Sequence, residues 1–218
     1  MLRPCRTMLT REIAVGAGLL SAAMTNAMRQ NEFQNYWVNE YPASPPIGFI
    51  LREKYKDDWL RVHSLPGGKR YPENDDEMRE VLLRHNSVLD ALLRKGDDFV
   101  LLTTGYSDEP TPVLPHLLHT DSALKNASRF AFTVSSDIGL PYWHFFVTAL
   151  NWQRGCLDAV LAQVATDTVA DILVIEQEQK CVYHPYDGGG DIIVRNDEAR
   201  TALKQMFSAW LSPRADGL

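Results

Sequence analysis

The chain has few cysteines and a shortage of positive charge, and each shortage excludes a class of protein. Its 218 residues include three cysteines, Cys5, Cys156 and Cys181, whose spacing matches no metal-binding or redox motif. So few cysteines are typical of a reducing compartment, although a Cys156–Cys181 bridge is compatible with the sequence. The formal net charge is −6, which argues against a nucleic-acid binder because such proteins need a basic face.

Long apolar runs are also missing, with one short exception near the start. The stretch Ile13–Met24 is apolar and follows three arginines, but it is shorter than the roughly 20 residues that span a bilayer. It is compatible with a surface or packing helix, with a secretion signal, or with an extension upstream of a true start at Met28. We expect no membrane span and a cytoplasmic protein, or an exported one if residues 1–27 are a signal peptide.

The motifs that usually reveal an enzyme are absent as well. The sequence contains no GxGxxG, no P-loop and no GxSxG. His116 and His119, followed by Asp121, are spaced to share one helix face, but Pro115 indicates a junction of loop and helix and no Glu follows the first His as in HExxH. We therefore predict no catalytic residues, no cofactor and no metal, and we regard a binding protein as the better hypothesis.

The composition is that of an ordinary globular domain, with 45% hydrophobic and 23% charged residues. A chain of this length can bury a sizeable core without disulfides or metals. The stretch YPASPP marks the entry into the folded body. We expect residues 1–31 to be an N-terminal extension and residues 32–218 to form a single α/β domain.

Hydrophobic periodicity predicts an alternation of strands and helices. The clearest element is a helix over residues 75–94, which Asn74 can cap with Glu77 three residues further on, and which Gly96 can end. We also expect strands at 48–53, 59–65, 99–106, 130–136, 142–152, 172–176, 180–185 and 191–195, and helices at 122–128, 157–164 and 198–211. This order predicts an α+β fold, a mixed and mostly antiparallel sheet packed by about three to four helices.

Two loops carry the residues that we predict to bind a partner. The segment RVHSLPGGKRY gathers basic and aromatic side chains around a Gly-Gly turn, a pattern that can bind an anion or donate protons and is also typical of a solvated strand end. A proline-rich loop follows at 108–115, and exposed loops are frequent binding sites. The predicted partner-binding residues are Arg61, His63, Lys69, Arg70, Tyr71, Asp108 and Glu109.

A third segment, YHPYDGGGDIIV, places three glycines between two aspartates and between two expected strands. A phosphate or calcium site is one interpretation, but the EF-hand pattern is absent and the aspartates would repel phosphate. A tight connection between strands explains the glycines better. We therefore predict a structural turn formed by Asp187, Gly188, Gly190 and Asp191.

These segments also carry a family resemblance. WLRVHSLPGGKRYPE, HPYDGGGDIIV and the later AWLS resemble an uncharacterised family of small bacterial proteins over residues 36–213. Its C-terminal hairpin and helix resemble a domain of unknown function, although this chain has three plain glycines and no arginine in the turn. Families of this kind look like immunity proteins of polymorphic toxin systems, which implies a cognate toxin as the partner.

The resemblance and the acidic composition together favour a protein-binding module that neutralises a bacterial toxin. The first alternative is a small hydrolase or transferase that uses His63, which requires that residue to lie in a pocket near a carboxylate. The second alternative is an exported protein. Neither the identity of the partner nor the oligomeric state follows from the residues.

Overall fold

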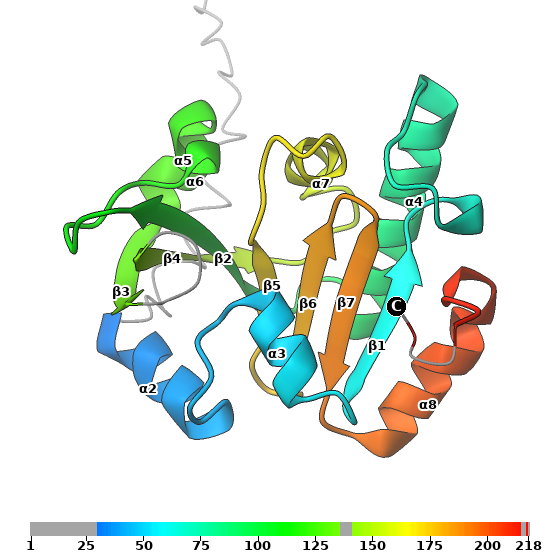
Figure 1. Cartoon of the computed structure of the whole chain (residues 1–218), viewed down its shortest axis with the longest axis horizontal. Helices are drawn as coiled ribbons and strands as arrows, with labels where there is room; N and C mark the ends of the chain where they lie inside the picture. The colour runs from blue at the N-terminus through cyan, green and yellow to red at the C-terminus, as the bar shows by residue number, and fades with distance from the viewer. Residues whose placement is uncertain (1–29, 136–140, 215–216, 218) are drawn as a thin grey trace, which may run out of the picture.

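One antiparallel sheet of seven strands, in the order β1-β7-β6-β5-β2-β4-β3, forms the centre of the molecule (Figure 1). The computed structural model describes residues 30–135, 141–214 and 217. The strands are β1 (Trp59–His63), β2 (Asp98–Ser107), β3 (Arg129–Ser135), β4 (Tyr142–Asn151), β5 (Leu173–Glu176), β6 (Cys181–Tyr186) and β7 (Gly189–Val194). The predicted α+β fold with a mostly antiparallel sheet is confirmed.

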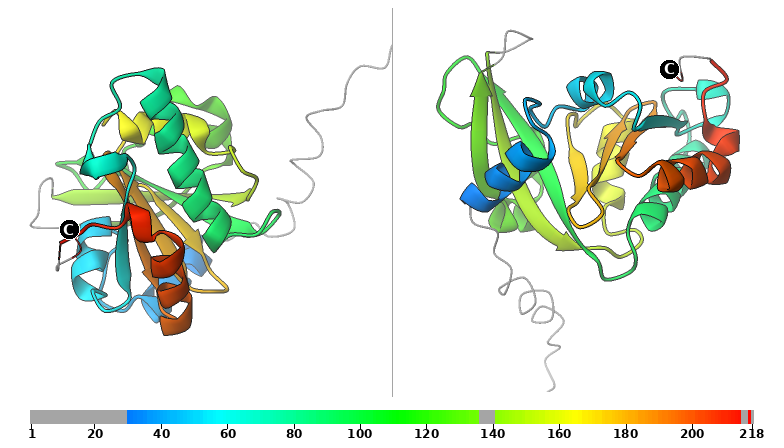
Figure 2. Two further views of the ribbon diagram at one scale, coloured as in Figure 1. Left: turned by 90° about the vertical axis from the view of Figure 1, so that its right-hand side faces the viewer. Right: turned by 90° about the horizontal axis from the view of Figure 1, so that it is seen from below.

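Helices cover both faces of this sheet (Figure 2). They are α2 (Gln30–Glu40), α3 (Gly48–Lys54), α4 (Asp75–Leu92), α5 (His116–Thr120), α6 (Ser122–Ala127), α7 (Asp158–Ala165) and α8 (Asp197–Met206), with 3-10 turns at Pro66–Gly68 and Ser208–Trp210. The cores place α4, α7 and α8 on one face and α2 and α3 on the other. The four expected helices are present, and α2, α3 and α5 are additional.

Successive side chains of the strands point to opposite faces of the sheet and are buried in two separate cores. On one face Leu101 of β2 is buried together with Leu89 of α4 and Leu161 of α7. On the other face Leu102 is buried together with Trp37 of α2. Because both faces of the central strands are covered, their sequences are continuously apolar rather than alternating.

Two N-terminal helices differ from the sequence expectation. The strand predicted at 48–53 is wrong, because this segment is the helix α3, which buries Leu51 and the preceding Ile47 against the sheet. A short apolar run fits either structure, and the spacing of four residues between those two side chains is the helical signal. Helix α2 shows the same spacing, since Phe33, Trp37 and Tyr41 are all buried.

Helix α4 begins as predicted. The Asn74 side chain accepts a hydrogen bond from the backbone N–H of Glu77 at 3.0 Å, which satisfies one of the free donors of the first turn. The helix ends at Leu92, two residues before the expected end. Gly96 has the left-handed backbone expected of it (φ 91°), but its N–H donates to the carbonyl of Trp152 at 2.9 Å instead of capping the helix.

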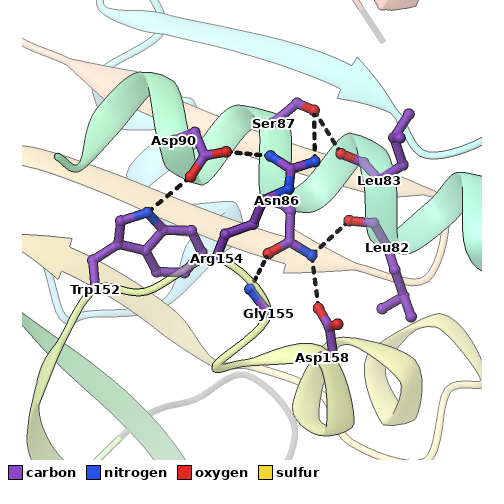
Figure 3. Close-up of polar contacts among 9 residues, drawn as sticks. All are labelled: Leu82, Leu83, Asn86, Ser87, Asp90, Trp152, Arg154, Gly155 and Asp158. Atoms are coloured by element: carbon purple, nitrogen blue, oxygen red, sulfur yellow. Dashed lines mark hydrogen bonds and ion pairs between the residues drawn. The ribbon is translucent and has the colours of Figure 1, made fainter. Parts of the chain in front are cut away.

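A polar network connects α4 to the segment between β4 and α7 and to the first residue of α7 (Figure 3). The Asn86 side chain donates to Asp158 Oδ1 at 2.7 Å and accepts from the backbone N–H of Gly155 at 2.8 Å. One turn further on, Asp90 accepts from the indole N–H of Trp152 at 3.0 Å. These bonds fix the orientation of α4, and thereby of the loop that precedes it.

Several expectations concern the termini and the cysteines. The three interpretations of the N-terminal run lie outside the described residues, as does Cys5. Cys156 and Cys181 are both free thiols, so the bridge that the sequence left open is not formed. Within the described ranges, none of the helices combines the length and apolar character that crossing a membrane requires.

Candidate functional site

The predicted segments lie along one edge of the sheet, which we call the loop edge. Because neighbouring strands are antiparallel, β1, β6 and β2 run in the same direction and end at this edge, where β5 begins. The loop edge therefore consists of residues 64–73, 108–115, 166–172 and 187–188. The two outer loops are not adjacent, because four inter-strand spacings of about 4.8 Å separate β1 from β2, roughly 19 Å in all.

Arg61 and Asp191 form a buried brace behind the loop edge. The register pairs them across β1 and β7, and Arg61 donates from Nε to Oδ1 at 2.7 Å and from Nη2 to Oδ2 at 2.9 Å. The Arg61 guanidinium also lies 4.7 Å from the centroid of the Tyr186 ring. Asp191 is only 2% exposed, so this ion pair stabilises the domain from within. Arg61, which was predicted to contact a partner, is therefore already bound to a carboxylate of its own domain.

Arg70 and Tyr71 form an exposed pair that a buried carboxylate holds in place. Arg70 Nε donates to Asp187 Oδ2 at 2.6 Å, and the Arg70 side chain is 64% exposed while that of Asp187 is 6% exposed. The guanidinium lies 5.6 Å from the Tyr71 ring centroid. Hydrogen bonding to Asp187 raises the pKa of both the Arg70 guanidinium and the Tyr71 hydroxyl. The first and third predicted segments thus meet here.

Lys69 connects the same loop to helix α4. Its Nζ lies 2.7 Å from both carboxylate oxygens of Glu77 and 3.0 Å from Glu73 Oε2. The bond to Glu77 raises the pKa of Lys69 and lowers that of Glu77. Lys69 therefore positions the neighbouring Arg70, and its charge is already balanced within the domain.

His63 lines a cavity of about 460 Å³ with Arg84, Trp210 and the Gly-Gly turn. Its Nε2 is buried and has no hydrogen-bond partner. Burial lowers the pKa of His63, and the charges of Arg61 and Arg84 lower it further. Among the described residues, no carboxylate forms a hydrogen bond or ion pair with its ring. His63 therefore lies in a pocket, as the enzyme alternative requires. The carboxylate that this alternative also requires is not found beside the ring among the described residues.

The glycine segment forms a tight turn and a close backbone contact. Asp187 and Gly188 are the two residues between β6 and β7, whereas Gly190 and Asp191, which were predicted to belong to the turn, lie within β7 because both pair with neighbouring strands. A Cβ at Gly189 would lie 2.0 Å from the carbonyl oxygen of Val62, and a Cβ at Gly190 would lie 2.3 Å from the Tyr183 ring. Each flanking aspartate is paired with an arginine, Asp187 with Arg70 and Asp191 with Arg61, so their charges are compensated.

Asp108 and Glu109 are exposed at the far end of the loop edge. The Ser107 hydroxyl donates to the carbonyl of Glu109 at 2.6 Å and shapes the start of their loop. Sequence reasoning missed the loop 166–172, which connects α7 to the start of β5 at the same edge. Its one signal was the polar stretch TDTVAD between a helix and a strand. The Asp167 charge raises the pKa of Arg70 and of Tyr71, which links this loop to the exposed pair.

The two histidines that were considered as metal ligands lie on α5, and both are exposed. Across the ranges that the structure describes, no group of three or more His, Cys, Asp or Glu side chains is arranged to hold a metal ion.

Comparison with known proteins places the chain in a family. No curated protein and no solved structure matches it significantly. The model of a domain of unknown function, DUF3885, matches residues 47–215. This range contains β1 to β7, the buried Arg61–Asp191 brace and the whole loop edge. The chain belongs to the DUF3885 family.

Proposed function

We propose that the chain is a protein-binding module that neutralises a cognate bacterial toxin from the cytoplasm, with the loop edge as its binding surface. The observation that carries this proposal is the exposed Arg70–Tyr71 pair fixed by the buried Asp187. Tyrosine and arginine are the residue types enriched at the energetic centres of protein interfaces. Because the pair is already ordered in the free protein, binding loses less side-chain entropy.

The charge of the protein supports a basic partner. The formal net charge is −6, and Asp108, Glu109 and Asp167 are exposed along the loop edge. Complementary charges at the rim of an interface accelerate association and reject wrong partners. The identification of this partner as a toxin rests on the resemblance to immunity proteins.

The test starts from a tagged protein used to capture its partner in the source bacterium, followed by affinity measurements with both components purified. We expect Arg70→Ala and Tyr71→Ala each to weaken binding at least about 30-fold, as truncation of a central interface residue does. Arg79→Ala is the matched control, because Arg79 is similarly exposed on α4. Unchanged affinity in both loop variants would exclude this loop as the interface.

The neutralising activity is tested separately from the interface. The captured partner is expressed in a susceptible host with and without the chain, and growth is recorded. We expect the partner alone to stop growth and the wild-type chain to restore it, whereas Tyr71→Ala restores it less. A partner that leaves growth unaffected would contradict the proposal that the partner is a toxin. The chain would then be proposed only as a protein-binding module.

A second candidate function, a hydrolase or transferase that uses His63, is favoured by the cavity that this residue lines. It predicts turnover of an ester or phosphoester that His63→Gln abolishes while the folded protein persists. An exported protein is the remaining alternative, and mass spectrometry of the mature N-terminus decides between export and the cytoplasm.

A further inference from the structure

A second cavity, of about 330 Å³, opens between the end of β2, the segment 113–117 and the loop 167–172. It lies among the loops of the loop edge, beside Asp167, whose charge also acts on Arg70 and Tyr71. Cavities of this size accept a small molecule or one long side chain. The cavity is distinct from the one that His63 lines, since no residue is shared between them.

The walls of this cavity are fixed by contacts that leave little freedom. Gly105 of β2 has no room for a side chain, because a Cβ there would lie 2.0 Å from the carbonyl oxygen of Val113. Asp171 does not line the cavity, but it anchors the loop that does, and its backbone is left-handed (φ 51°). Its carbonyl accepts from Thr104 Oγ1 at 2.8 Å and its carboxylate accepts from the Tyr106 hydroxyl. The cavity is therefore preformed.

Two aspartates of the loop 166–172 have left-handed backbone. Asp167, like Asp171, has positive φ, at 55°. Left-handed backbone is uncommon for non-glycine residues, although aspartate is among those that tolerate it, and it is more frequent at binding sites. Of these two aspartates, Asp167 lines the cavity, and the carboxylate of Asp171 accepts a hydrogen bond from the Tyr106 hydroxyl.

An unsatisfied hydroxyl lies at the floor. Thr103 lines the cavity and is fully buried, and its Oγ1 has no hydrogen-bond partner. Successive strand residues point to opposite faces, so Thr103 shares its face with Gly105, which contacts the cavity wall at Val113. A buried hydroxyl without a partner is unfavourable, and a ligand that donates a hydrogen bond here would satisfy it.

We propose that this cavity receives a basic side chain, Arg or Lys, of the protein partner, an inference that rests on the proposed function. The aliphatic stem lies against Val113, Leu114 and Val169, and the cationic head binds to the Asp167 carboxylate and the Thr103 hydroxyl. A long side chain with an apolar stem and a charged donor matches these walls. The positive charge of such a side chain is also complementary to the net charge of −6 of the protein.

The probes for this site are N-acetyl-arginine amide and N-acetyl-lysine amide, titrated into isotope-labelled full-length protein and followed by NMR. We expect saturable shifts of the backbone amides of residues 103–106 and 167–170, with dissociation constants in the millimolar range typical of a single side chain. N-acetyl-glutamine amide, which is uncharged, should bind at least about fivefold more weakly. Equal binding of the glutamine and arginine probes, or no saturable shift at these residues, would overturn the inference.

Two variants identify the groups that bind the probe. Thr103→Val removes the hydroxyl and keeps the shape, and Asp167→Asn keeps a residue that tolerates left-handed backbone while removing the charge. We expect each to weaken arginine-probe binding at least about fivefold, with Thr103→Val leaving the stability equal or higher. Thr148→Val is the matched control, since Thr148 carries a second buried hydroxyl without a partner but does not line the cavity.

The same variants separate this inference from the proposed function. Weaker partner capture by Thr103→Val, together with probe binding, supports the cavity as the receiving site. If Thr103→Val and Asp167→Asn capture the partner like the wild type while Tyr71→Ala does not, the cavity inference fails and the interface at Tyr71 stands. If Arg70→Ala and Tyr71→Ala capture normally while the cavity variants do not, the interface proposed at Arg70 fails and the cavity inference stands.

Discussion

At the scale of single residues, Gly189 and Gly190 are important for the stability of the fold, because neighbouring atoms occupy the space that a Cβ would need. We predict that Gly190→Ala destabilises the fold by about 1–3 kcal/mol, the usual cost of overpacking. The added methyl would meet the ring of Tyr183, which is buried and shares a 2.5 Å hydrogen bond with His85 Nδ1. Urea unfolding of the two proteins under identical conditions gives the difference.

The control for this prediction is Gly67→Asn. Gly67 has a left-handed backbone (φ 67°), but nothing lies within 4 Å of a Cβ placed there, and asparagine tolerates that conformation. We expect a change of less than about 1 kcal/mol in this variant. A Gly190→Ala protein as stable as the wild type would show that Tyr183 can move aside, which would remove the packing explanation for this glycine.

Single residues also show what sequence reading achieves. Arg61 and Asp191 were both identified, but in different motifs and with different roles, because nothing in the sequence gives the register that pairs β1 with β7. Asp187 was interpreted as part of a turn, which it is, whereas its ion pair with Arg70 depends on a loop 117 residues away. The sequence predicts which residues form a local turn, but it does not predict which distant residue pairs with them.

At the scale of elements, periodicity located the long strands and α4, and it failed for short apolar segments. The segment 48–53 was assigned to a strand because a run of six residues is too short to distinguish a period of two from one of 3.6. The pairing order of the strands was also beyond the sequence, since β2 lies between β5 and β4 through contacts that only the folded chain defines.

The polar network of α4 gives a prediction at this scale. Asn86→Ala removes the bonds to Asp158 and Gly155 and leaves the backbone N–H of Gly155 without its partner. Asn86 is 4% exposed, so we expect a loss of about 1–3 kcal/mol, the cost of unsatisfied buried groups. Denaturant unfolding measures the loss, and hydrogen exchange should show faster opening at Gly155.

The matched control on the same helix is Leu83→Ala, because Leu83 is half exposed. Its truncation should change the stability by less than about 1 kcal/mol. If Asn86→Ala and Leu83→Ala were equally mild, α4 would be held by its apolar contacts alone, and the network in Figure 3 would not fix its orientation.

At the scale of the whole molecule, the binding surface is where sequence and structure diverge most. The segments 61–71 and 108–115 were chosen from composition, and the fold brings their loops to one edge. The loop 166–172 and the buried Thr103 escaped notice because their significance lies in a cavity that three separate segments of the chain enclose. A site built from distant segments leaves no contiguous motif.

Histidines that are buried or partly buried make the stability of the whole molecule depend on pH. Burial lowers the pKa of His63, His144 and His184, and it lowers that of His85 to about 4. In the unfolded chain a histidine titrates near 6.5. Between these two values the unfolded state binds more protons than the native state, so acid favours unfolding.

We therefore predict that the free energy of unfolding is greatest above pH 6.5 and falls as the pH decreases from about 6.5 to about 4. His85 alone contributes a loss of about 3 kcal/mol, because each unit of pKa difference corresponds to about 1.4 kcal/mol. Urea unfolding of the wild type, His85→Gln and His119→Gln across this range measures the slope. The His85 variant should show a flatter profile, whereas His119, which is exposed, should leave the slope unchanged. A wild-type slope in His85→Gln would mean that this histidine is protonated in the native state, and the acid sensitivity would then belong to the other buried histidines.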